Sequence, residues 1–307
     1  MYHRFNENKY PSTNIKIDIF KKQLELIEEN NIEYYDPANF DTEFNHPKKN
    51  KKVLITIDDA FSSFYENAWP ILKEGKIPFI LFVSTEPVGK PGYMNWEQIR
   101  EISSYDFAYI GNHSHTHEYL LDFSHLEFTK DIKHSIRIFR DKLGYNPIYF
   151  SYPFGEYNLK QTQFIKNNFK YGFGQHSGVI DLTKNPFELP RFPINEKYGD
   201  LDRFEFIIKL LPIPYKNLIP EDKYINSNQN PPTIEIDFFE EQKNIKNINC
   251  FSNEGNKWRN SITKFEKNTL KIDFREKFIF RRGRVNCSIN DNDVWRWLGI
   301  QISVEIN

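Results

Sequence analysis

The chain has 307 residues, of which 39% are hydrophobic and 27% charged, which is enough for one large packed domain and a small one and excludes disorder by composition. The formal net charge is -1, from 41 Lys and Arg against 42 Asp and Glu, so the chain has no electrostatic footprint of a protein that binds nucleic acid or an anionic membrane. No run of about 18 apolar residues occurs, so no membrane span is predicted.

Strands and helices are predicted to alternate over residues 1–211. Strands are predicted at 1–5, 32–35, 53–57, 78–83, 107–110, 147–151, 171–174 and 189–194. Helices are predicted at 15–30, 62–74, 95–103, 124–143, 159–168 and 201–210, with a polar connection at 36–52. This alternation is typical of parallel strands joined by crossover helices, either as a barrel or as an open sheet.

The composition changes after residue 211. Five prolines among polar residues predict a linker over 212–232. Beyond it, short alternating runs at 233–239, 245–251, 269–274, 284–289 and 298–306 predict a small antiparallel β domain over 233–307. A sandwich is the expected arrangement of that domain.

The two cysteines, Cys250 and Cys287, are too few for a disulfide framework, and neither lies in a C-x-x-C motif. They form one bridge in an oxidising compartment, or they remain two buried thiols. No signal peptide is visible at the N-terminus. We therefore expect the periplasm or cell envelope if a signal precedes Met1, and the cytoplasm if Met1 is the true start. No pattern indicates an oligomeric state.

The predicted strand 53–57 ends in two adjacent carboxylates, Asp58 and Asp59. Neighbouring carboxylates repel one another, and burial makes the repulsion worse, so a cation beside them is expected. His113 and His117 are four residues apart, which places both imidazoles on one side of the chain. One carboxylate and two imidazoles are a common ligand set for a divalent metal with a position open to water. The second carboxylate is then free to act as a base.

Three polar or special segments each follow a predicted strand: the Asp pair, the His pair and the turn Tyr152-Pro153-Phe154-Gly155. In a parallel barrel, residues at the carboxyl ends of the strands share one rim, where the chemistry takes place. We therefore expect these segments to lie together.

In this order, the segments Thr56–Asp59, His113–His117 and Phe150–Gly155 resemble the motifs of the NodB-type polysaccharide deacetylases, carbohydrate esterase family 4. The opening Tyr2-His3-Arg4 is typical of the branch related to poly-N-acetylglucosamine deacetylases. The resemblance spans roughly residues 1–211. It implies an α/β fold, a distorted (β/α) barrel of NodB type, and metal-dependent removal of acetyl groups from an N-acetylated polysaccharide or oligosaccharide.

Carried over by position, the resemblance implies that Asp59, His113 and His117 bind the metal and that Asp58 is the general base. Zinc is the expected metal, with cobalt, nickel or manganese as alternatives. A backbone N–H at Tyr152 is expected to stabilise the oxyanion.

The chain departs from the family pattern at two places. Ser151 stands where the family often has an Arg that orients the base, and Arg191 is the candidate replacement, with a surface Arg as the alternative. The late Leu-x-His segment that supplies the general acid is not visible. His176 is the candidate acid, with an ordinary loop histidine as the alternative, and His3 is assigned no chemistry.

Two other functions compete with a polysaccharide deacetylase. The chain could be a catalytically impaired carbohydrate-binding protein on the same barrel, which Ser151 and the missing late histidine favour. It could also be a related hydrolase of non-sugar amides. The four intact residues Asp58, Asp59, His113 and His117 argue against an impaired protein.

Overall fold

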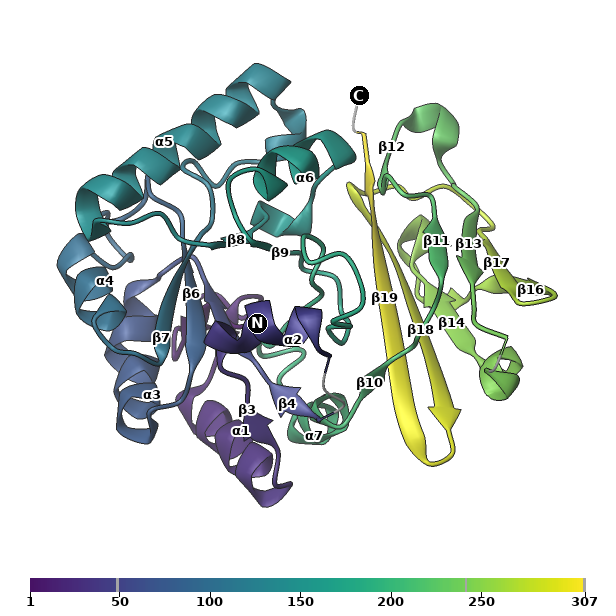
Figure 1. The fold of residues 1–307 in the computed structure, drawn as a ribbon, viewed down its shortest axis with the longest axis horizontal. Coiled ribbons are helices and arrows are strands. Elements are labelled where there is room, and N and C mark those ends of the chain that lie inside the picture. The colour runs from purple at the N-terminus through teal and green to yellow at the C-terminus, as the bar shows by residue number, and fades with distance from the viewer. Residues whose placement is uncertain (48–49, 241, 306–307) are drawn as a thin grey trace.

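The computed structural model describes residues 1–47, 50–240 and 242–305, which form two parts lying side by side (Figure 1). The first part alternates strands and helices, and the second is built from mainly antiparallel strands. Lys48 and Lys49 of the predicted polar connection, and Ile306 of the last predicted strand, lie outside the described residues.

The first part is organised around a parallel sheet whose five strands follow one another in chain order. They are β5 (Ile55–Asp58), β6 (Phe79–Val83), β7 (Ala108–Asn112), β8 (Tyr149–Ser151) and β9 (Tyr171–Phe173). The returning helices are α3 (Trp69–Gly75), α4 (Trp96–Ser103), α5 (His125–Leu143) and α6 (Leu159–Lys166). All five residues of β6 are buried, as expected for a strand covered on both faces. The prediction of an α/β fold with a parallel sheet is confirmed.

The first and last segments of the first part connect the two edges of this sheet. Each segment pairs with one edge strand, and the two segments are bonded to each other. On one edge, Tyr2 N–H donates to the Thr56 carbonyl at 2.8 Å, and on the other Leu189 pairs with Phe173. Ile194 N–H in turn donates to the Met1 carbonyl at 2.9 Å. The sheet is therefore curled, and residues 1–2 and 189–194 run between its edges.

The remaining elements of the first part are β1 (Arg4–Phe5), β2 (Asn14–Ile15), α1 (Ile17–Glu29), β3 (Glu33–Tyr34), α2 (Phe40–Asn45), β4 (Lys52–Val53) and α7 (Leu201–Ile208). The helix starts follow from local chemistry, because Asn95 and Ser124 form capping boxes at α4 and α5. Gly144 ends α5 in the left-handed conformation, with φ 82°. One helix was predicted over 62–74, but a π-helical turn at Phe64–Ala68 precedes α3.

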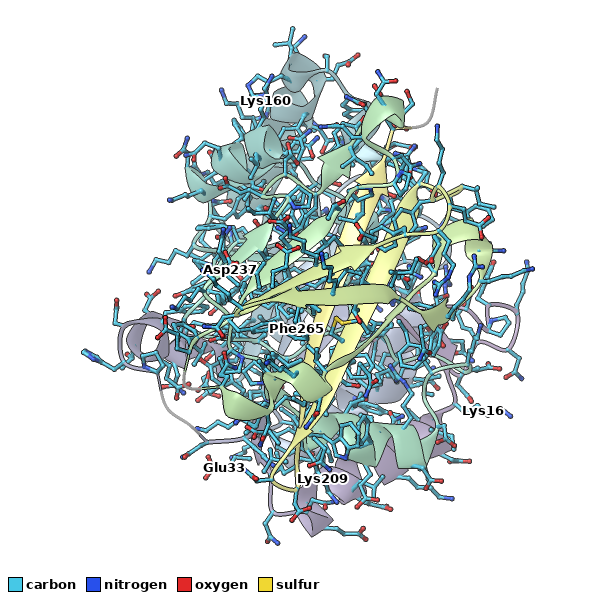
Figure 2. The ribbon with its side chains drawn as sticks, turned by 90° about the vertical axis from the view of Figure 1, so that its right-hand side faces the viewer. Lys16, Glu33, Lys160, Lys209, Asp237 and Phe265 are labelled. Atoms are coloured by element: carbon cyan, nitrogen blue, oxygen red, sulfur yellow. A yellow bond between two sulfur atoms is a disulfide. The ribbon has the colours of Figure 1, made fainter. Side chains whose placement is uncertain are left out.

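The second part contains two sheets: the larger is mixed, because β10 and β12 pair in parallel with β19, and the smaller is antiparallel. The larger has β10 (Leu211–Pro212), β12 (Tyr224–Ile225), β14 (Asn249–Ser252), β15 (Arg259–Asn260), β18 (Arg282–Asp291) and β19 (Val294–Val304). The smaller has β11 (Asn217–Ile219), β13 (Ile234–Asp237), β16 (Ile262–Glu266) and β17 (Thr269–Asp273). In Figure 2, Asp237 and Phe265 mark the smaller sheet in front of the β18–β19 hairpin. Buried residues of both sheets belong to one hydrophobic cluster. The sandwich arrangement stays a prediction.

The prediction that residues 212–232 form a linker is wrong, because strands of this segment belong to the sheets of the second part. Strands β10 and β12 pair with β19, and β11 pairs with β13. The prolines are compatible with this pairing because each strand has only two or three residues.

Cys250 and Cys287 lie opposite each other on β14 and β18 and form a disulfide, which decides between the two expected alternatives. Of the helices in the described ranges, none has the length and apolar character that a membrane crossing requires.

Candidate metal centre

The predicted metal ligands lie where β5 and β7 end. Asp59 follows the last residue of β5 and His113 follows the last residue of β7, so both stand at the carboxyl end of the parallel sheet. The chain turns sharply there, with positive φ at Asp59 (77°), Ser114 (71°) and His117 (56°). Such conformations persist only when neighbouring groups fix them.

The histidine segment is fixed by side chains from β7 and α5. The Asn112 carboxamide oxygen accepts the Ser114 N–H at 2.8 Å. The carboxylate of Asp131 accepts the N–H groups of His115 and Thr116 at 2.8 and 3.1 Å. These bonds satisfy the backbone of a tight loop and hold His113 and His117 in place.

Asp59, His113 and His117 are brought together as predicted. One ligand atom from each residue lies within 4.8 Å of the others, and within the described ranges this is the one group of at least three such side chains. Asp59 Oδ1 is 3.1 Å from His117 Nε2 and 3.6 Å from His113 Nε2.

The hydrogen bonding of His113 fits a metal ligand. Its Nδ1 lies 2.7 Å from the Ser151 carbonyl oxygen, which can only accept, so Nδ1 carries the proton. The lone pair of Nε2 then points toward Asp59. This buried Nε2 and Asp59 Oδ1 find no hydrogen-bond partner among the described residues. Two buried acceptors that face each other without a proton are satisfied by a cation, so these residues fit a divalent metal.

The charge states of Asp59 and His113 suit the same role. Burial lowers the pKa of His113 to about 4, which keeps it neutral at pH 7. Burial opposes the charged form of Asp59, but contact with His117 and the nearby histidine charges outweigh it, and the pKa of Asp59 is lowered. A carboxylate and a neutral imidazole are the forms that bind metal.

Asp58 is held by Arg191, the arginine that the sequence offered as a candidate. Two parallel bonds join the guanidinium to the carboxylate: Nη1 to Oδ1 at 2.6 Å and Nη2 to Oδ2 at 2.9 Å. Arg191 also donates to Ser151 Oγ at 2.7 Å and to the Gly174 carbonyl at 2.8 Å. Burial opposes the ionised form of Asp58, but the charges of Arg191 and of the nearby histidines outweigh it, and the pKa of Asp58 is lowered. The alternative of a surface arginine is excluded because Arg191 is buried.

Tyr152 does not offer the free N–H that was expected. That N–H donates to the Phe173 carbonyl at 3.0 Å, as part of the pairing between β8 and β9. Pro153 has no N–H, so the next donor in this turn belongs to Phe154. Phe154 has φ 58°, and its ring centroid lies 4.9 Å from that of His117.

His176 is not suited to the expected role of general acid. It lines a small cavity between the two parts of the molecule, together with Glu188, Lys223 and Trp297. Burial lowers the pKa of His176 to about 3, and the charges of Lys223 and Arg191 add to the shift, so at pH 7 the side chain is a neutral imidazole and not the more acidic imidazolium.

His3 is the residue near the carboxylate pair that the sequence analysis left without a role. The pKa of His3 is lowered, because burial outweighs the opposing charges of Asp59 and Asp58, whose field reaches the imidazole. Residue 3 directly follows Tyr2, which pairs with Ile57 of β5. The signal was present in Tyr2-His3-Arg4, but no spacing relation connects position 3 with position 58.

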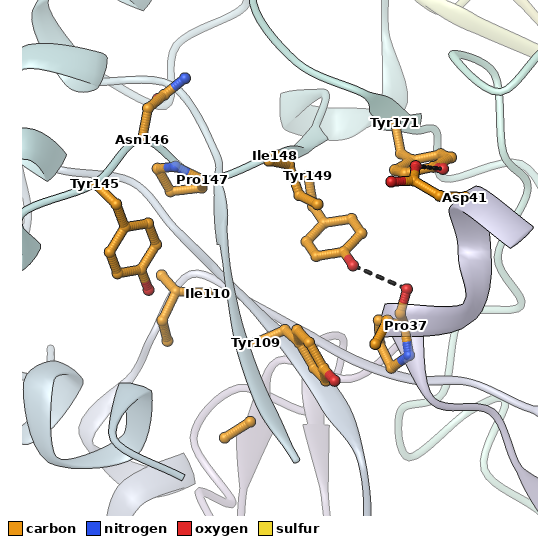
Figure 3. A pocket seen from close by; sticks show the side chains of 12 residues that line it. Pro37, Asp41, Tyr109, Ile110, Tyr145, Asn146, Pro147, Ile148, Tyr149 and Tyr171 are labelled. Carbon is orange, nitrogen blue, oxygen red and sulfur yellow. Dashed lines mark hydrogen bonds between the residues drawn. The ribbon is translucent and has the colours of Figure 1, made fainter. Parts of the chain in front are cut away.

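A second hollow, shown in Figure 3, lies at the opposite end of the sheet. Its volume is about 380 Å³, and its lining includes Ala108, Tyr149 and Tyr171, the first residues of β7, β8 and β9. The Tyr149 hydroxyl donates to the Pro37 carbonyl at 3.0 Å, as the dashed line shows. This hollow is separate from the metal ligands, which follow the ends of the strands.

Comparison with known proteins identifies the first part of the chain. Residues 45–171 match the family model of polysaccharide deacetylases. The poly-β-1,6-N-acetyl-D-glucosamine N-deacetylase of Staphylococcus aureus (strain MSSA476) is 26% identical over 208 residues, which are 62% of this chain and 69% of that protein.

Two solved structures share the fold. The deacetylase PplD of Streptococcus pyogenes, in complex with acetate, is 23% identical with a TM-score of 0.58, over 64% of this chain and 92% of that one. IcaB from Ammonifex degensii is 22% identical with a TM-score of 0.59, over 67% of this chain and 94% of that one. The predicted resemblance to polysaccharide deacetylases is confirmed, and each of the two structures leaves about a third of this chain uncovered.

Proposed function

We propose that this chain, a polysaccharide deacetylase of the NodB type, hydrolyses the N-acetyl groups of N-acetylglucosamine units in a polysaccharide. The reaction consumes water, releases acetate and leaves a free amine on the sugar. The observation that carries this proposal is the Asp59–His113–His117 group. Beside it lies Asp58, whose carboxylate forms two hydrogen bonds with Arg191. The similarity to the staphylococcal enzyme supports β-1,6-linked N-acetylglucosamine as the first substrate to test.

Asp59, His113 and His117 would hold the divalent cation, with zinc first and cobalt, nickel or manganese as alternatives. When bound, such a cation supplies Lewis-acid chemistry: it lowers the pKa of water and polarises a carbonyl. His113 is oriented for this task by its bond to the Ser151 carbonyl.

Asp58 would accept the proton of the attacking water. Its lowered pKa keeps it ionised at neutral pH. The bidentate contact with Arg191 fixes the plane of the carboxylate, so the basic oxygen does not have to be ordered during the reaction. Ser151 adds to this arrangement by accepting the second Nη2 bond of Arg191.

The N–H of Phe154 would donate to the oxygen that becomes negative as the acetyl carbonyl is attacked. It replaces the N–H of Tyr152, which the sheet already uses. His3 would donate the proton that the leaving amine requires. The charges of Asp59 and Asp58 oppose the lowering of the His3 pKa by burial, whereas Lys223 and Arg191 add to the lowering of the His176 pKa.

The competing hypothesis of an impaired carbohydrate-binding protein depended on the missing late histidine and, above all, on Ser151 in place of an arginine. Arg191 supplies a guanidinium to the same carboxylate from a different segment. This contact removes the main argument for that hypothesis.

The experiment is acetate release from a panel of N-acetylated glycans, with β-1,6-linked N-acetylglucosamine oligomers first and cyclic amides as the non-sugar control. Acetate should be released from the glycans, the chelated protein should be inactive, and Asp59→Asn should lose both metal and turnover. Release from cyclic amides alone, or full activity in Asp59→Asn, would contradict the proposal.

We place this activity at the cell envelope. The Cys250–Cys287 bridge supports an oxidising compartment, because structural disulfides are rare in reducing cytosol.

A further inference from the structure

The second part of the chain contacts the rim of the metal centre through its long hairpin. Figure 1 shows β18 and β19 on the side of the second part that faces the curled sheet. Gln301 of β19 donates to the Gly155 carbonyl at 2.9 Å, and the Trp297 indole N–H donates to the Ser177 carbonyl at 3.0 Å. At Gly299 a Cβ would lie 1.7 Å from the Ser177 carbonyl oxygen, so no other residue fits there. The two parts therefore pack closely at this rim.

Arg281, the residue before β18, forms ion pairs with two carboxylates of the first part. It donates to Asp122 at 2.8 and 3.0 Å and to Glu156 at 3.1 Å. Glu156 is 2% exposed and directly follows the Phe154-Gly155 turn, so Arg281 neutralises a buried charge beside the metal centre. Arg282 Nε lies 3.5 Å from the same carboxylate, so Glu156 keeps one cationic neighbour when Arg281 is replaced.

Arg281 also begins a row of stacked side chains that ends at a metal ligand. Its guanidinium carbon lies 4.2 Å from the centre of the Tyr119 ring. Tyr119 stacks on Phe154, with 4.2 Å between ring centroids and 21° between the planes. Phe154 in turn contacts His117 in a T-shaped arrangement, with 4.9 Å between the ring centroids. Contact is continuous from the second part of the chain to His117.

Of the two histidine ligands, His117 depends more on such packing. The His113 side chain is fully buried and its Nδ1 is fixed by a carbonyl, whereas the His117 side chain is 26% exposed. The ring of Phe154 covers one side of His117 and limits its rotation. Phe154 itself sits at positive φ in a short turn that Glu156 follows, so its position depends on what holds that turn.

We propose that Arg281 is a positioning residue for the metal centre: it holds Tyr119 and Phe154 against His117, so the second part of the chain sets the orientation of one metal ligand. The deacetylase assignment concerns only the activity arm of the test below. The metal arm is independent of it.

The test uses the full chain and Co²⁺ as the metal probe, because the visible spectrum of bound Co²⁺ reports ligand geometry. Arg281→Gln should bind Co²⁺ about tenfold more weakly and show an altered spectrum, by analogy with other residues that orient metal ligands. Its kcat for acetate release should fall about tenfold with little change in KM, and Arg281→Lys should recover part of the loss because it keeps the charge but not the fork.

Arg275→Gln is the matched control. Arg275 also pairs with a buried carboxylate, that of Glu254, at 3.2 Å, but it does so within the second part. This variant should lose stability without changing Co²⁺ affinity, spectrum or kcat.

Tyr119→Leu tests the row of stacked rings without touching the Glu156 pair, and Tyr119→Phe should restore wild-type behaviour. Wild-type Co²⁺ affinity and spectrum in both Arg281→Gln and Tyr119→Leu would overturn the inference. If Arg281→Gln does not fold, Tyr119→Leu decides alone. If the wild type releases no acetate, the proposed function fails while the Co²⁺ comparison still decides this inference.

Discussion

Replacing Arg191 with methionine should destabilise the protein strongly, because it leaves the Asp58 carboxylate buried without its partner. Asp58 is 0% exposed, and both of its oxygens accept from Arg191 at 2.6 and 2.9 Å. Breaking a buried pair from one side costs about 3–5 kcal/mol, whereas an exposed pair is worth about 0–1 kcal/mol. The matched control is Lys209→Met, which removes an exposed partner of Glu205.

The same variant makes a prediction about pH. In the wild type, burial raises the pKa of Asp58, but the charge of Arg191 and its other partners outweigh burial, and the pKa is lowered. A lowered carboxyl pKa contributes stability that is complete above the unfolded pKa and is lost as the pH falls through the folded value. In Arg191→Met, burial dominates and the pKa of Asp58 rises. The variant is then penalised most when Asp58 is ionised, so its deficit should be larger at pH 8 than at pH 5.

The assay is chemical denaturation of the metal-free protein, with wild type, Arg191→Met, Asp58→Asn and the double variant compared at both pH values. The double variant should be more stable than Arg191→Met, since a neutral carboxamide carries no buried charge, and the cycle isolates the coupling between the two residues. The reasoning is refuted if Arg191→Met costs less than about 1 kcal/mol at pH 8, or if the double variant recovers nothing.

Three further predictions concern single roles in the proposed site and fold. Asp58→Asn should retain bound metal but lose about 10²–10⁴-fold in kcat, as expected for a general base; full turnover measured by acetate release would remove Asp58 from that role. His3→Gln should lower kcat by a similar factor at unchanged metal content, whereas His176→Gln should leave kcat within about twofold, and the reverse result would return the acid role to His176. Replacing Cys250 and Cys287 together with alanine should lower the stability of the second part by about 2–4 kcal/mol, since the bridge closes a sequence separation of 37 residues, and an unchanged denaturation midpoint would show that the bridge is dispensable.

The comparison of sequence and structure is clearest at Arg191. The sequence showed that the usual arginine was replaced by Ser151 and that Arg191 lay within the predicted strand 189–194. It did not show that Arg191 reaches Asp58 across 133 positions. That contact depends on residues 189–194 lying beside β9, which brings them to the centre of the curled sheet.

The differences between expectation and structure at Tyr152, His176 and the segment 212–232 have a common cause. Whether a backbone N–H is hydrogen-bonded depends on the neighbouring strand, and the N–H of Tyr152 donates to the Phe173 carbonyl. A loop histidine is an acid or an inert imidazole according to burial, and the second part buries His176. Proline-rich residues form a linker or short edge strands according to whether a partner strand is present, and β19 and β13 provide one.

By itself, the sequence determined what depends on neighbours along the chain. The alternation of strands and helices, the helix starts at Asn95 and Ser124, and the paired ligands His113 and His117 all follow from short-range spacing. Only the tertiary structure decided which distant groups meet: Arg191 with Asp58, His3 with the carboxylate pair, and Arg281 with Glu156. The physical reason is that local conformation is encoded within a few residues, whereas burial, charge and hydrogen-bond partners are set by strands whose order in space the local pattern does not specify.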